Sequence, residues 1–470
     1  MAKTYTAFKN RILILGFGSI GGGVLPLLLR HIDMKPSQIT IVTAEERGKA
    51  EAKEYGIEFI VHPLTKENYK EFLEKHLGAG DFLINVSVDV SSIALIEFCQ
   101  SKGALYIDTC IEPWPGLYTD ASLSPSHRSN YGLRETALAL RPKYPNGSTA
   151  VIAHGANPGL VTHFVKQALL DMAKATDVKT DVPKSQKDWG LLMEKLGIKT
   201  IHVAERDTQV STRNKEPGEF VNTWSIDGFF SEGSQPAELG WGTHEKALPP
   251  DGRKHEFGSG AAIYLARPGY TTRVRSWTPL EGPYQGFLIT HNESISIADY
   301  FTVRDGDKVR HRVTCHYAYH PCDDAVLSMH ELNGKNGELQ DRKRLMVDEI
   351  TEGTDELGVL LMGNKKGVYW YGSRLSIEET RKLVPHNNAT SLQVTVAVLA
   401  GVIWAIENPK AGVVEPENID FARILEIAIP YLGEMAGVWG DWTPLQGRST
   451  LFEEDIDASD PWQFKNIRVA

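Results

Sequence analysis

The feature that most constrains this fold is a glycine-rich turn near the beginning of the chain. The apolar run Ile12–Leu15 leads directly into Gly16-Phe-Gly18-Ser-Ile-Gly21. A short strand, a G-x-G-x-x-G turn and a helix start are typical of a Rossmann-type nucleotide-binding domain. The first glycine allows the tight turn, the second lets a pyrophosphate approach the backbone, and the third lets the helix pack on the strand. The free N–H groups at the start of the helix would then face the phosphates.

The same strand–helix alternation continues to about residue 155, which makes the glycine motif a strong signal. Helical stretches such as Ile20–His31 and Lys66–His76 lie between short apolar runs. The runs that we expect to be strands are Ile12–Leu15, Ile39–Val42, Phe59–Val61, Phe82–Val86, Leu105–Ile107 and Val151–Ala153. Continuous apolar runs separated by helices predict buried parallel strands with helices on both faces. The predicted fold class is therefore α/β, with a Rossmann-type doubly wound parallel sheet.

The motif predicts NAD as the cofactor, although one position departs from the usual pattern. The acidic residue expected at the end of the second strand is replaced by Thr43, with Glu45 and Glu46 just beyond it, and Arg47 leaves NADP open as an alternative. Ligands of such sheets lie at the carboxyl ends of the strands. The residues predicted to contact the cofactor from this domain are Gly16, Gly18, Ser19, Ile20, Gly21, Thr43, Ser87 and Asp108.

After Gly155 the pattern changes from parallel to alternating. Val161–Lys174 has the spacing of an amphipathic helix. Stretches rich in Val, Thr, Trp and Tyr then alternate with Gly, Pro and Asn, which is typical of a mixed or antiparallel sheet. They are Thr200–Ala204, Phe220–Ile226, Gly286–Thr290 and Val309–Tyr319.

Two more helices are expected at Ser376–Leu383 and Leu392–Ile406, and the second is apolar nearly all round, so we expect it to be buried between domains. The predicted organisation is a NAD-binding Rossmann domain at 1–155, followed by an α+β substrate-binding and dimerisation domain at 156–385. A C-terminal helix and tail at 386–470 are predicted to pack back on the Rossmann domain.

Bulk properties exclude several classes of protein. With 50 basic and 60 acidic residues the net charge is −10, which argues against nucleic acid or anionic lipid as a partner and is compatible with a cationic ligand. The longest apolar stretch, Val396–Ile406, is shorter than the ~20 residues of a membrane helix. The polar N-terminus and four cysteines give no secretion signal and no disulfide framework. A cytoplasmic enzyme is expected.

Five carboxylates stand at strand ends or in turns and are candidate site residues. Asp89 and Glu112 follow two of the Rossmann strands. Glu205, Glu232 and Asp355 lie in the second domain, where nothing in their spacing brings them together.

The segments around these residues resemble the bacterial homospermidine synthases over nearly the whole chain, and the architecture is more distantly similar to saccharopine dehydrogenase-like enzymes. The segments that carry the resemblance are Asn85-Val-Ser-Val-Asp89, Asp108-Thr-Cys-Ile-Glu112-Pro-Trp114, Gly155-Ala-Asn157-Pro-Gly159, Ile201-His-Val-Ala-Glu205-Arg-Asp207, Asn222-Thr-Trp224, Gln235-Pro-Ala-Glu238-Leu-Gly-Trp241, His291-Asn-Glu293-Ser-Ile-Ser and Asp460-Pro-Trp-Gln-Phe.

The resemblance implies a transferase that uses NAD as a bound hydride carrier, with no net redox change, and it implies a homodimer. Putrescine is oxidised to an imine, a second putrescine displaces ammonia, and the new imine is reduced to homospermidine. By the same resemblance Trp224 faces the imine cation, and Asn157 lies near the nicotinamide. The acid/base and ammonium-binding groups are Glu205, Glu232, His291 and Asp355, and the residues that guide the amine at the entrance are Asp89 and Glu112.

These residue types suit a diamine, because two ammonium groups about four carbons apart need several separated anions, and an aromatic face stabilises a cation by ~0.5–2 kcal/mol. Structural interpretations stay open beside this one. Trp224 in an alternating strand is typical of a core residue, and Asp89, ahead of Ser91 and Ser92, fits a helix cap. His291, followed by Asn and Glu, is equally typical of a structural histidine.

Other functions also remain open. The run from Cys315 to Cys322 contains His316 and His320, but in a strand Cys315 and His316 point to opposite faces, so no metal is expected. The alternative enzyme is a saccharopine-type oxidoreductase of amino-acid conjugates, which would use Arg273 and Arg275 to bind carboxylates. A non-catalytic NAD-sensing regulator is the remaining alternative.

Overall fold

The computed structural model describes residues 3–469, which form two compact units. Of the described residues, unit 1 comprises 3–160 and 378–432, and unit 2 comprises 161–377 and 433–469. Each unit is therefore built from two separate stretches of chain. The predicted division into three consecutive segments differs from this at the tail, which is divided between the two units.

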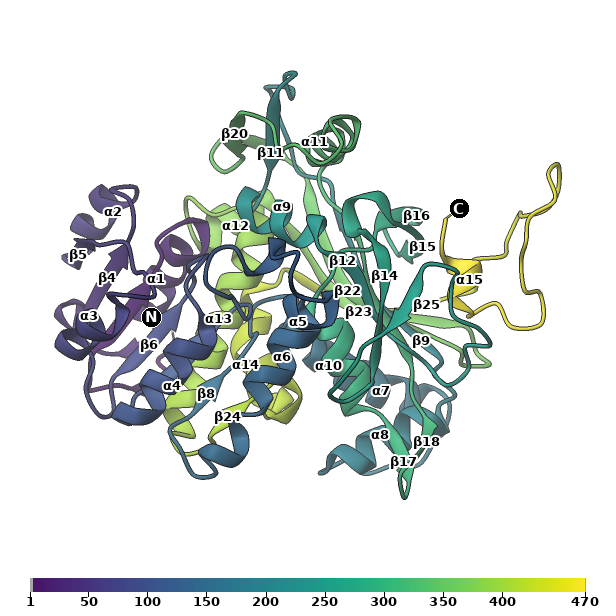
Figure 1. Ribbon diagram of the computed structural model, residues 1–470, viewed down its shortest axis with the longest axis horizontal. Coiled ribbons are helices and arrows are strands. Elements are labelled where there is room, and N and C mark those ends of the chain that lie inside the picture. The colour runs from purple at the N-terminus through teal and green to yellow at the C-terminus, as the bar shows by residue number, and fades with distance from the viewer. Residues whose placement is uncertain (1–2, 470) are drawn as a thin grey trace. The chain divides into compact units, whose positions relative to one another are not determined.

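Unit 1 contains a seven-stranded sheet in which every neighbouring pair runs parallel (Figure 1). In sheet order the strands are β24 (Val413–Val414), β8 (Ala150–Val151), β7 (Leu105–Asp108), β6 (Phe82–Asn85), β2 (Ile12–Leu15), β4 (Ile39–Thr43) and β5 (Glu58–Val61). The strand that enters the glycine motif is β2, which lies inside the sheet between β6 and β4. The predicted α/β doubly wound sheet is confirmed, and β8 ends before the predicted Ala153 because that residue has a left-handed φ of 54°.

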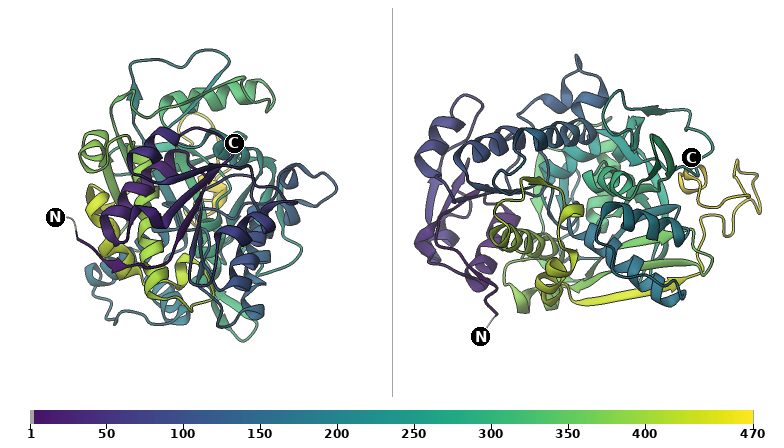
Figure 2. Two further views of the ribbon diagram at one scale, coloured as in Figure 1. Left: turned by 90° about the vertical axis from the view of Figure 1, so that its left-hand side faces the viewer. Right: turned by 90° about the horizontal axis from the view of Figure 1, so that it is seen from below.

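Helices cover both faces of this sheet, as the left view of Figure 2 shows for the purple N-terminal strands. On one face, Leu13 and Leu15 share a buried cluster with side chains of α3, α4 and α6. On the other face α13 packs along α1 and contacts β7 and β8. The helices of the unit are α1 (Ser19–His31), α2 (Lys49–Glu54), α3 (Tyr69–His76), α4 (Ser92–Lys102), α5 (Pro125–Arg128), α6 (Asn130–Leu138), α12 (Ile377–Leu383), α13 (Ala389–Glu407) and α14 (Phe421–Ala428).

The apolar helix α13 owes its composition to these contacts. Among the described residues it is the one helix long and apolar enough to cross a membrane, but 89% of its most apolar window is buried. Within unit 1 it contacts α1, α14 and the sheet, so apolar side chains are needed on most of its circumference.

Unit 2 is built on a ten-stranded mixed sheet (Figure 1). Its strands β9 and β19 run parallel to one another, and the other neighbouring pairs are antiparallel. The main path is β13 (Gly252–Lys254), β14 (Ala262–Pro268), β12 (Pro236–Gly240), β19 (Thr314–His320), β9 (Thr200–Asp207), β22 (Thr354–Met362), β23 (Val368–Ser376) and β25 (Glu434–Gly440), while β15 (Arg273–Thr278) pairs with β16 (Gly282–Phe287), which also pairs with β19. The α+β prediction for this part of the chain is thus confirmed.

Three small two-stranded sheets and several helices complete unit 2. The small sheets pair β10 (Val210–Ser211) with β21 (Ile350–Glu352), β11 (Glu219–Asn222) with β20 (Arg342–Leu345), and β17 (Val303–Asp305) with β18 (Lys308–His311). The helices are α7 (Leu160–Ala175), α8 (Gln186–Lys195), α9 (Ile226–Ser234), α10 (Asn292–Tyr300), α11 (Asp323–Gly334) and α15 (Phe464–Ile467). The predicted strand Phe220–Ile226 is wrong beyond Asn222, because Ser225 accepts a hydrogen bond from the Gly228 N–H at 3.1 Å and caps α9.

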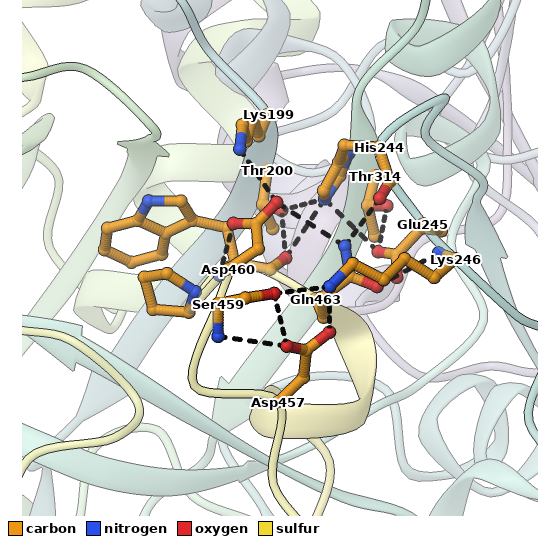
Figure 3. Close-up of polar contacts among 12 residues, drawn as sticks. Lys199, Thr200, His244, Glu245, Lys246, Thr314, Asp457, Ser459, Asp460 and Gln463 are labelled. Carbon is orange, nitrogen blue, oxygen red and sulfur yellow. Dashed lines mark hydrogen bonds and ion pairs between the residues drawn. The ribbon is translucent and has the colours of Figure 1, made fainter.

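The C-terminal tail is bound to unit 2 by polar contacts that Figure 3 shows. Lys199 Nζ lies 2.7 Å from Asp460 Oδ2. The carboxylate of Glu245 accepts hydrogen bonds from the Thr314 hydroxyl at 2.6 Å and from the Phe464 N–H at 3.0 Å, and burial raises its pKa to about 7. The prediction that the whole tail packs on the Rossmann domain is therefore wrong, because β25 extends the sheet of unit 2 and the tail follows it.

Candidate functional site

The glycine motif in unit 1 forms an open cradle at the start of α1. A Cβ at Gly16, where φ is 88°, would lie 2.7 Å from the Val86 carbonyl oxygen, and one at Gly21 would lie 2.5 Å from the Gly16 carbonyl oxygen. A Cβ at Gly18 would meet nothing within 4 Å, and no side chain caps the helix that begins at Ser19. Ile20 follows in the first turn of that helix. Two glycines are thus required by packing, whereas the third leaves space beside uncapped N–H groups, which fits a phosphate group.

Three further predicted cofactor residues lie at the carboxyl ends of neighbouring strands. Thr43 ends β4 and is partly exposed, and Ser87 follows β6 with its hydroxyl donating to Asn85 Oδ1 at 2.6 Å. Asp108 ends β7, but its buried carboxylate accepts hydrogen bonds from the Ala153 N–H at 2.6 Å and the Tyr106 hydroxyl at 2.8 Å. Burial raises the pKa of Asp108 to about 7. Its side chain therefore stabilises the end of the sheet through these two hydrogen bonds and is not exposed at the surface.

Asp89 and Glu112 belong to two loops that are joined at this edge of unit 1. Asp89 is exposed, with a left-handed φ of 61°, and the cap of α4 is Ser91, whose hydroxyl accepts from Ala94 N at 3.4 Å. Ser92 N–H donates to the Glu112 carbonyl at 2.8 Å, and the Ser92 hydroxyl accepts from Glu112 N–H at 3.0 Å. Ser91, and not Asp89, is therefore the residue that caps α4. The Asp89 side chain is exposed to solvent.

Asn157 is presented by a tight turn that follows β8. The Gly155 N–H donates to the Pro158 carbonyl at 2.7 Å, and the Leu160 N–H donates to the Gly155 carbonyl at 2.9 Å. Gly159 has a φ of 125° and approaches Gly155 so closely that a Cβ would lie 2.2 Å from its oxygen. The partly exposed Asn157 side chain is thus held on a fixed backbone.

In unit 2 the carboxylates Glu205 and Asp355 converge on two tyrosines of β19. Tyr319 lies opposite Glu205 in the parallel pair of β19 and β9, and Asp355 lies opposite Asp207 in the antiparallel pair of β22 and β9. The Tyr317 hydroxyl donates a short hydrogen bond to Glu205 Oε2. Burial, followed by the charges of Glu205, Asp207 and Asp355, raises the pKa of Tyr319 well above its usual value. Residues that are distant in sequence therefore share one buried, strongly negative region.

Trp224 lies in the short loop between β11 and α9 and is partly exposed. Its indole Nε1–H donates to the Tyr319 hydroxyl at 2.9 Å, and its carbonyl oxygen accepts from Asn222 Nδ2 at 3.1 Å. The indole also contacts the Phe229 ring at a centroid distance of 5.4 Å. This placement differs from the core-packing interpretation, since a strand residue of the core would be fully buried.

His291 bridges two glutamates. Its Nε2 lies 3.0 Å from Glu232 Oε2, and its Nδ1 lies 3.2 Å from Glu293 Oε1. Although burial alone would lower it, the charges of Glu293 and Glu232 raise the pKa of His291 well above its usual value of 6.5. The imidazole ring contacts the ring of Tyr317 at a centroid distance of 4.4 Å. At neutral pH this residue is therefore an imidazolium that balances part of the negative charge.

The raised pKa of His291 leads to a prediction about stability. A group whose pKa is higher in the folded than in the unfolded state stabilises the fold fully below the unfolded value, and the contribution is lost as the pH rises through the folded value. His291→Gln should therefore lower the free energy of unfolding most at about pH 6 and progressively less toward alkaline pH. Urea unfolding at several pH values measures this difference. A constant difference at all pH values would contradict the charged state of His291.

The unit 2 residues predicted from the sequence are thus connected, and three of their partners were missed. Glu232 contacts His291, whose ring contacts Tyr317, and Tyr317 binds Glu205. The missed partners are Glu293, Tyr317 and Tyr319. The alternation of residues along β19 is visible in the sequence and puts both tyrosines on one face of the strand. The pairing of β19 with β9, which brings them to Glu205, is not visible in the sequence.

Most of the segment from Cys315 to Cys322 forms strand β19 of the large sheet, and Cys322 directly precedes α11. Cys315 lies on the face of the tyrosines, whereas His316 lies on the other, where its ring contacts the ring of His202 in a tilted arrangement at a centroid distance of 4.1 Å. Among residues 3–469 no group of three or more His, Cys, Asp or Glu is arranged to hold a metal ion.

Comparisons with known proteins agree on one family. Residues 12–151 match the family described as saccharopine dehydrogenase NADP binding domain, and residues 155–441 match the saccharopine dehydrogenase C-terminal domain. A homospermidine synthase of Blastochloris viridis is 53% identical over 469 residues, which cover 99% of this chain and 98% of that protein. One of Mesorhizobium japonicum is 50% identical over 99% of this chain and 97% of that protein.

A solved structure is similar over the same length. The crystal structure of a homospermidine synthase from Legionella pneumophila in complex with NAD matches with a TM-score of 0.93 and 50% identity, covering 99% of this chain and 98% of that chain.

Proposed function

The chain belongs to the homospermidine synthases, within the saccharopine dehydrogenase-like enzymes, and on this premise we propose that it makes homospermidine from two molecules of putrescine with NAD as a bound hydride carrier. The observation that carries the proposal is the connected set of Trp224, Glu205, Glu232, His291 and Asp355 in unit 2. It combines an aromatic face with separated carboxylates, which is the chemistry that a diamine and its imine cation require.

The cradle in unit 1 supports the cofactor part of the proposal. The space at Gly18 and the uncapped start of α1 fit a pyrophosphate, and Thr43 lies where a ribose would be bound. When bound, NAD would accept a hydride from the amine carbon and later return it. We assign NAD rather than NADP because the solved relative holds NAD and because Glu45 and Glu46, which disfavour a phosphate, follow β4. Asn157, on its fixed turn, is proposed to contact the nicotinamide end.

The residues of unit 2 are proposed to bind the amine groups and to move protons. Hydride can leave only from a carbon whose amine nitrogen has lost its proton, so one carboxylate must act as the base. Glu205 is suited to this, because the Tyr317 hydroxyl holds it in place. The imidazolium of His291 can donate a proton to departing ammonia, and Glu232 and Asp355 attract the ammonium groups. Asp89 and Glu112, on their joined loops in unit 1, are proposed to guide the diamine at the entrance.

The two arginines that a saccharopine-type substrate would need are engaged elsewhere in unit 2. Arg273 lies 3.4 Å from the centroid of the Phe287 ring and donates to the Tyr270 carbonyl, and Arg275 donates to the Arg468 carbonyl at 2.7 Å. Their positions favour a diamine over a carboxylate-bearing substrate, and the buried acids and paired histidine are unnecessary for a sensor of NAD.

Incubation of the purified enzyme with NAD and putrescine tests the proposal. We expect homospermidine and ammonia in equal amounts, identified by mass, while the absorbance of NADH does not accumulate. Stoichiometric NADH formation without homospermidine would identify a dehydrogenase instead, and NAD binding without any amine-dependent product would identify a sensor.

Two finer points belong to the proposal. We infer a homodimer formed through unit 2, which light scattering of the purified protein measures. We also place the enzyme in the cytoplasm, which is supported by its four free cysteine thiols and its net charge of −10. The same charge argues against nucleic acid as a partner.

A further inference from the structure

Trp224 is partly exposed and lies in a loop, but it is held at three points. Asn222 fixes its backbone carbonyl at 3.1 Å, and the Phe229 ring supports the indole at 5.4 Å. Phe229 belongs to α9, and a Cβ at Gly228 of the same helix would lie only 3.2 Å from Trp224 Cζ3, so this second point is the contact of the indole with the first turn of α9. The third point is the hydrogen bond from its Nε1–H to Tyr319.

Tyr319 is rigid enough to act as an anchor. It is fully buried, and its ring stacks on Tyr317 at 4.9 Å with an interplanar angle of 13°. Its ring also meets Phe229 edge-on at 5.6 Å, so Trp224, Phe229 and Tyr319 form one aromatic cluster. Because β19 pairs with both β9 and β16, the backbone that carries Tyr319 is fixed on both sides.

We propose that Tyr319 is a positioning residue of the reaction, whose hydroxyl fixes the orientation of the Trp224 indole so that its face is presented to the imine cation. The proposal rests on the function proposed above. The strength of a cation–π contact depends on the cation lying over the ring face, and an indole that can rotate about its two side-chain torsions presents that face only part of the time. An indole held at Nε1 has no such freedom.

Tyr319→Phe removes the hydroxyl and keeps the ring, so it tests the anchor directly. Loss of one net hydrogen bond corresponds to a decrease in kcat of between about twofold and tenfold. KM for putrescine should change less, because the imine cation forms only after the diamine is bound. In the Trp224→Phe background the same change should have almost no effect, since phenylalanine has no N–H to anchor. Equal decreases in both backgrounds, or no decrease in either, would overturn the proposal.

A spectroscopic measurement separates this inference from the proposed function. In protein labelled with 5-fluorotryptophan, the Trp224 resonance is the one that Trp224→Phe removes. Tyr319→Phe should shift or broaden that resonance whether or not the enzyme makes homospermidine. Tyr369→Phe is the matched control, because it removes the hydroxyl of a tyrosine on β23 of the same sheet that donates to Asp171 at 3.2 Å. A Trp224 resonance that is unchanged in Tyr319→Phe, or changed as much in Tyr369→Phe, would show that Tyr319 does not anchor the indole.

Discussion

Replacing Trp224 with lysine is expected to reduce homospermidine formation at least about a hundredfold, because it places an ammonium group where a cationic imine must form. Two unit charges 4 Å apart repel by about 4 kcal/mol at an effective dielectric constant near 20, and each 1.4 kcal/mol is tenfold in rate. Trp224→Phe should keep partial activity, since the phenyl ring has a weaker but real negative face. Trp224→Ala should lose most of the turnover.

Stability distinguishes this role from core packing. Truncation of a buried core tryptophan costs ~3–5 kcal/mol, whereas a partly exposed indole on a loop should cost much less. The measurements are turnover with putrescine and the urea midpoint for all three variants. If Trp224→Ala lowers the midpoint severely and the activity only follows the folded fraction, Trp224 is a packing residue and its role at the cation is wrong.

The second large effect is expected for Gly18→Val in unit 1. The isopropyl group would occupy the space that the pyrophosphate needs, so we expect NAD binding to fall below detection by calorimetry. The variant should fold, because a Cβ at this position meets nothing within 4 Å and the φ of −83° suits an L-residue.

Gly334→Val provides the matched control. A Cβ at Gly334, at the end of α11 in unit 2, also meets nothing within 4 Å, and its φ lies outside the left-handed region. This variant should bind NAD as the natural sequence does. Undiminished NAD affinity in Gly18→Val would mean that the cradle does not hold the cofactor.

Structural features could be predicted from the sequence where the residues that determine them lie close together in the chain. The strand Ile12–Leu15 and the glycine turn were predictable because the motif and its helix lie within about twenty consecutive residues. The order of strands in unit 2 has no such local signal. Tyr317 reaches Glu205 across 112 residues of sequence, through a parallel pairing that only the folded sheet reveals.

The role of His291 shows a similar limit. Its sequence neighbour Glu293 was visible, but a histidine close to one carboxylate is compatible with a base, an acid or a structural residue. Only the position of Glu232 on its other ring nitrogen, brought there by α9, determines that the ring carries a positive charge. The charge that His291 carries could therefore not be predicted from its sequence neighbours alone.

The discontinuous make-up of both units has a consequence for biosynthesis. Unit 1 receives α13 and the edge strand β24 from residues beyond 377, and unit 2 receives β25 and α15 from residues beyond 432. Domains generally fold as whole units while the ribosome works from the N-terminus. Neither sheet can be finished until nearly all of the polypeptide has emerged, so the nascent chain must carry two incomplete cores at once, and a stop codon late in the message would leave both of them open.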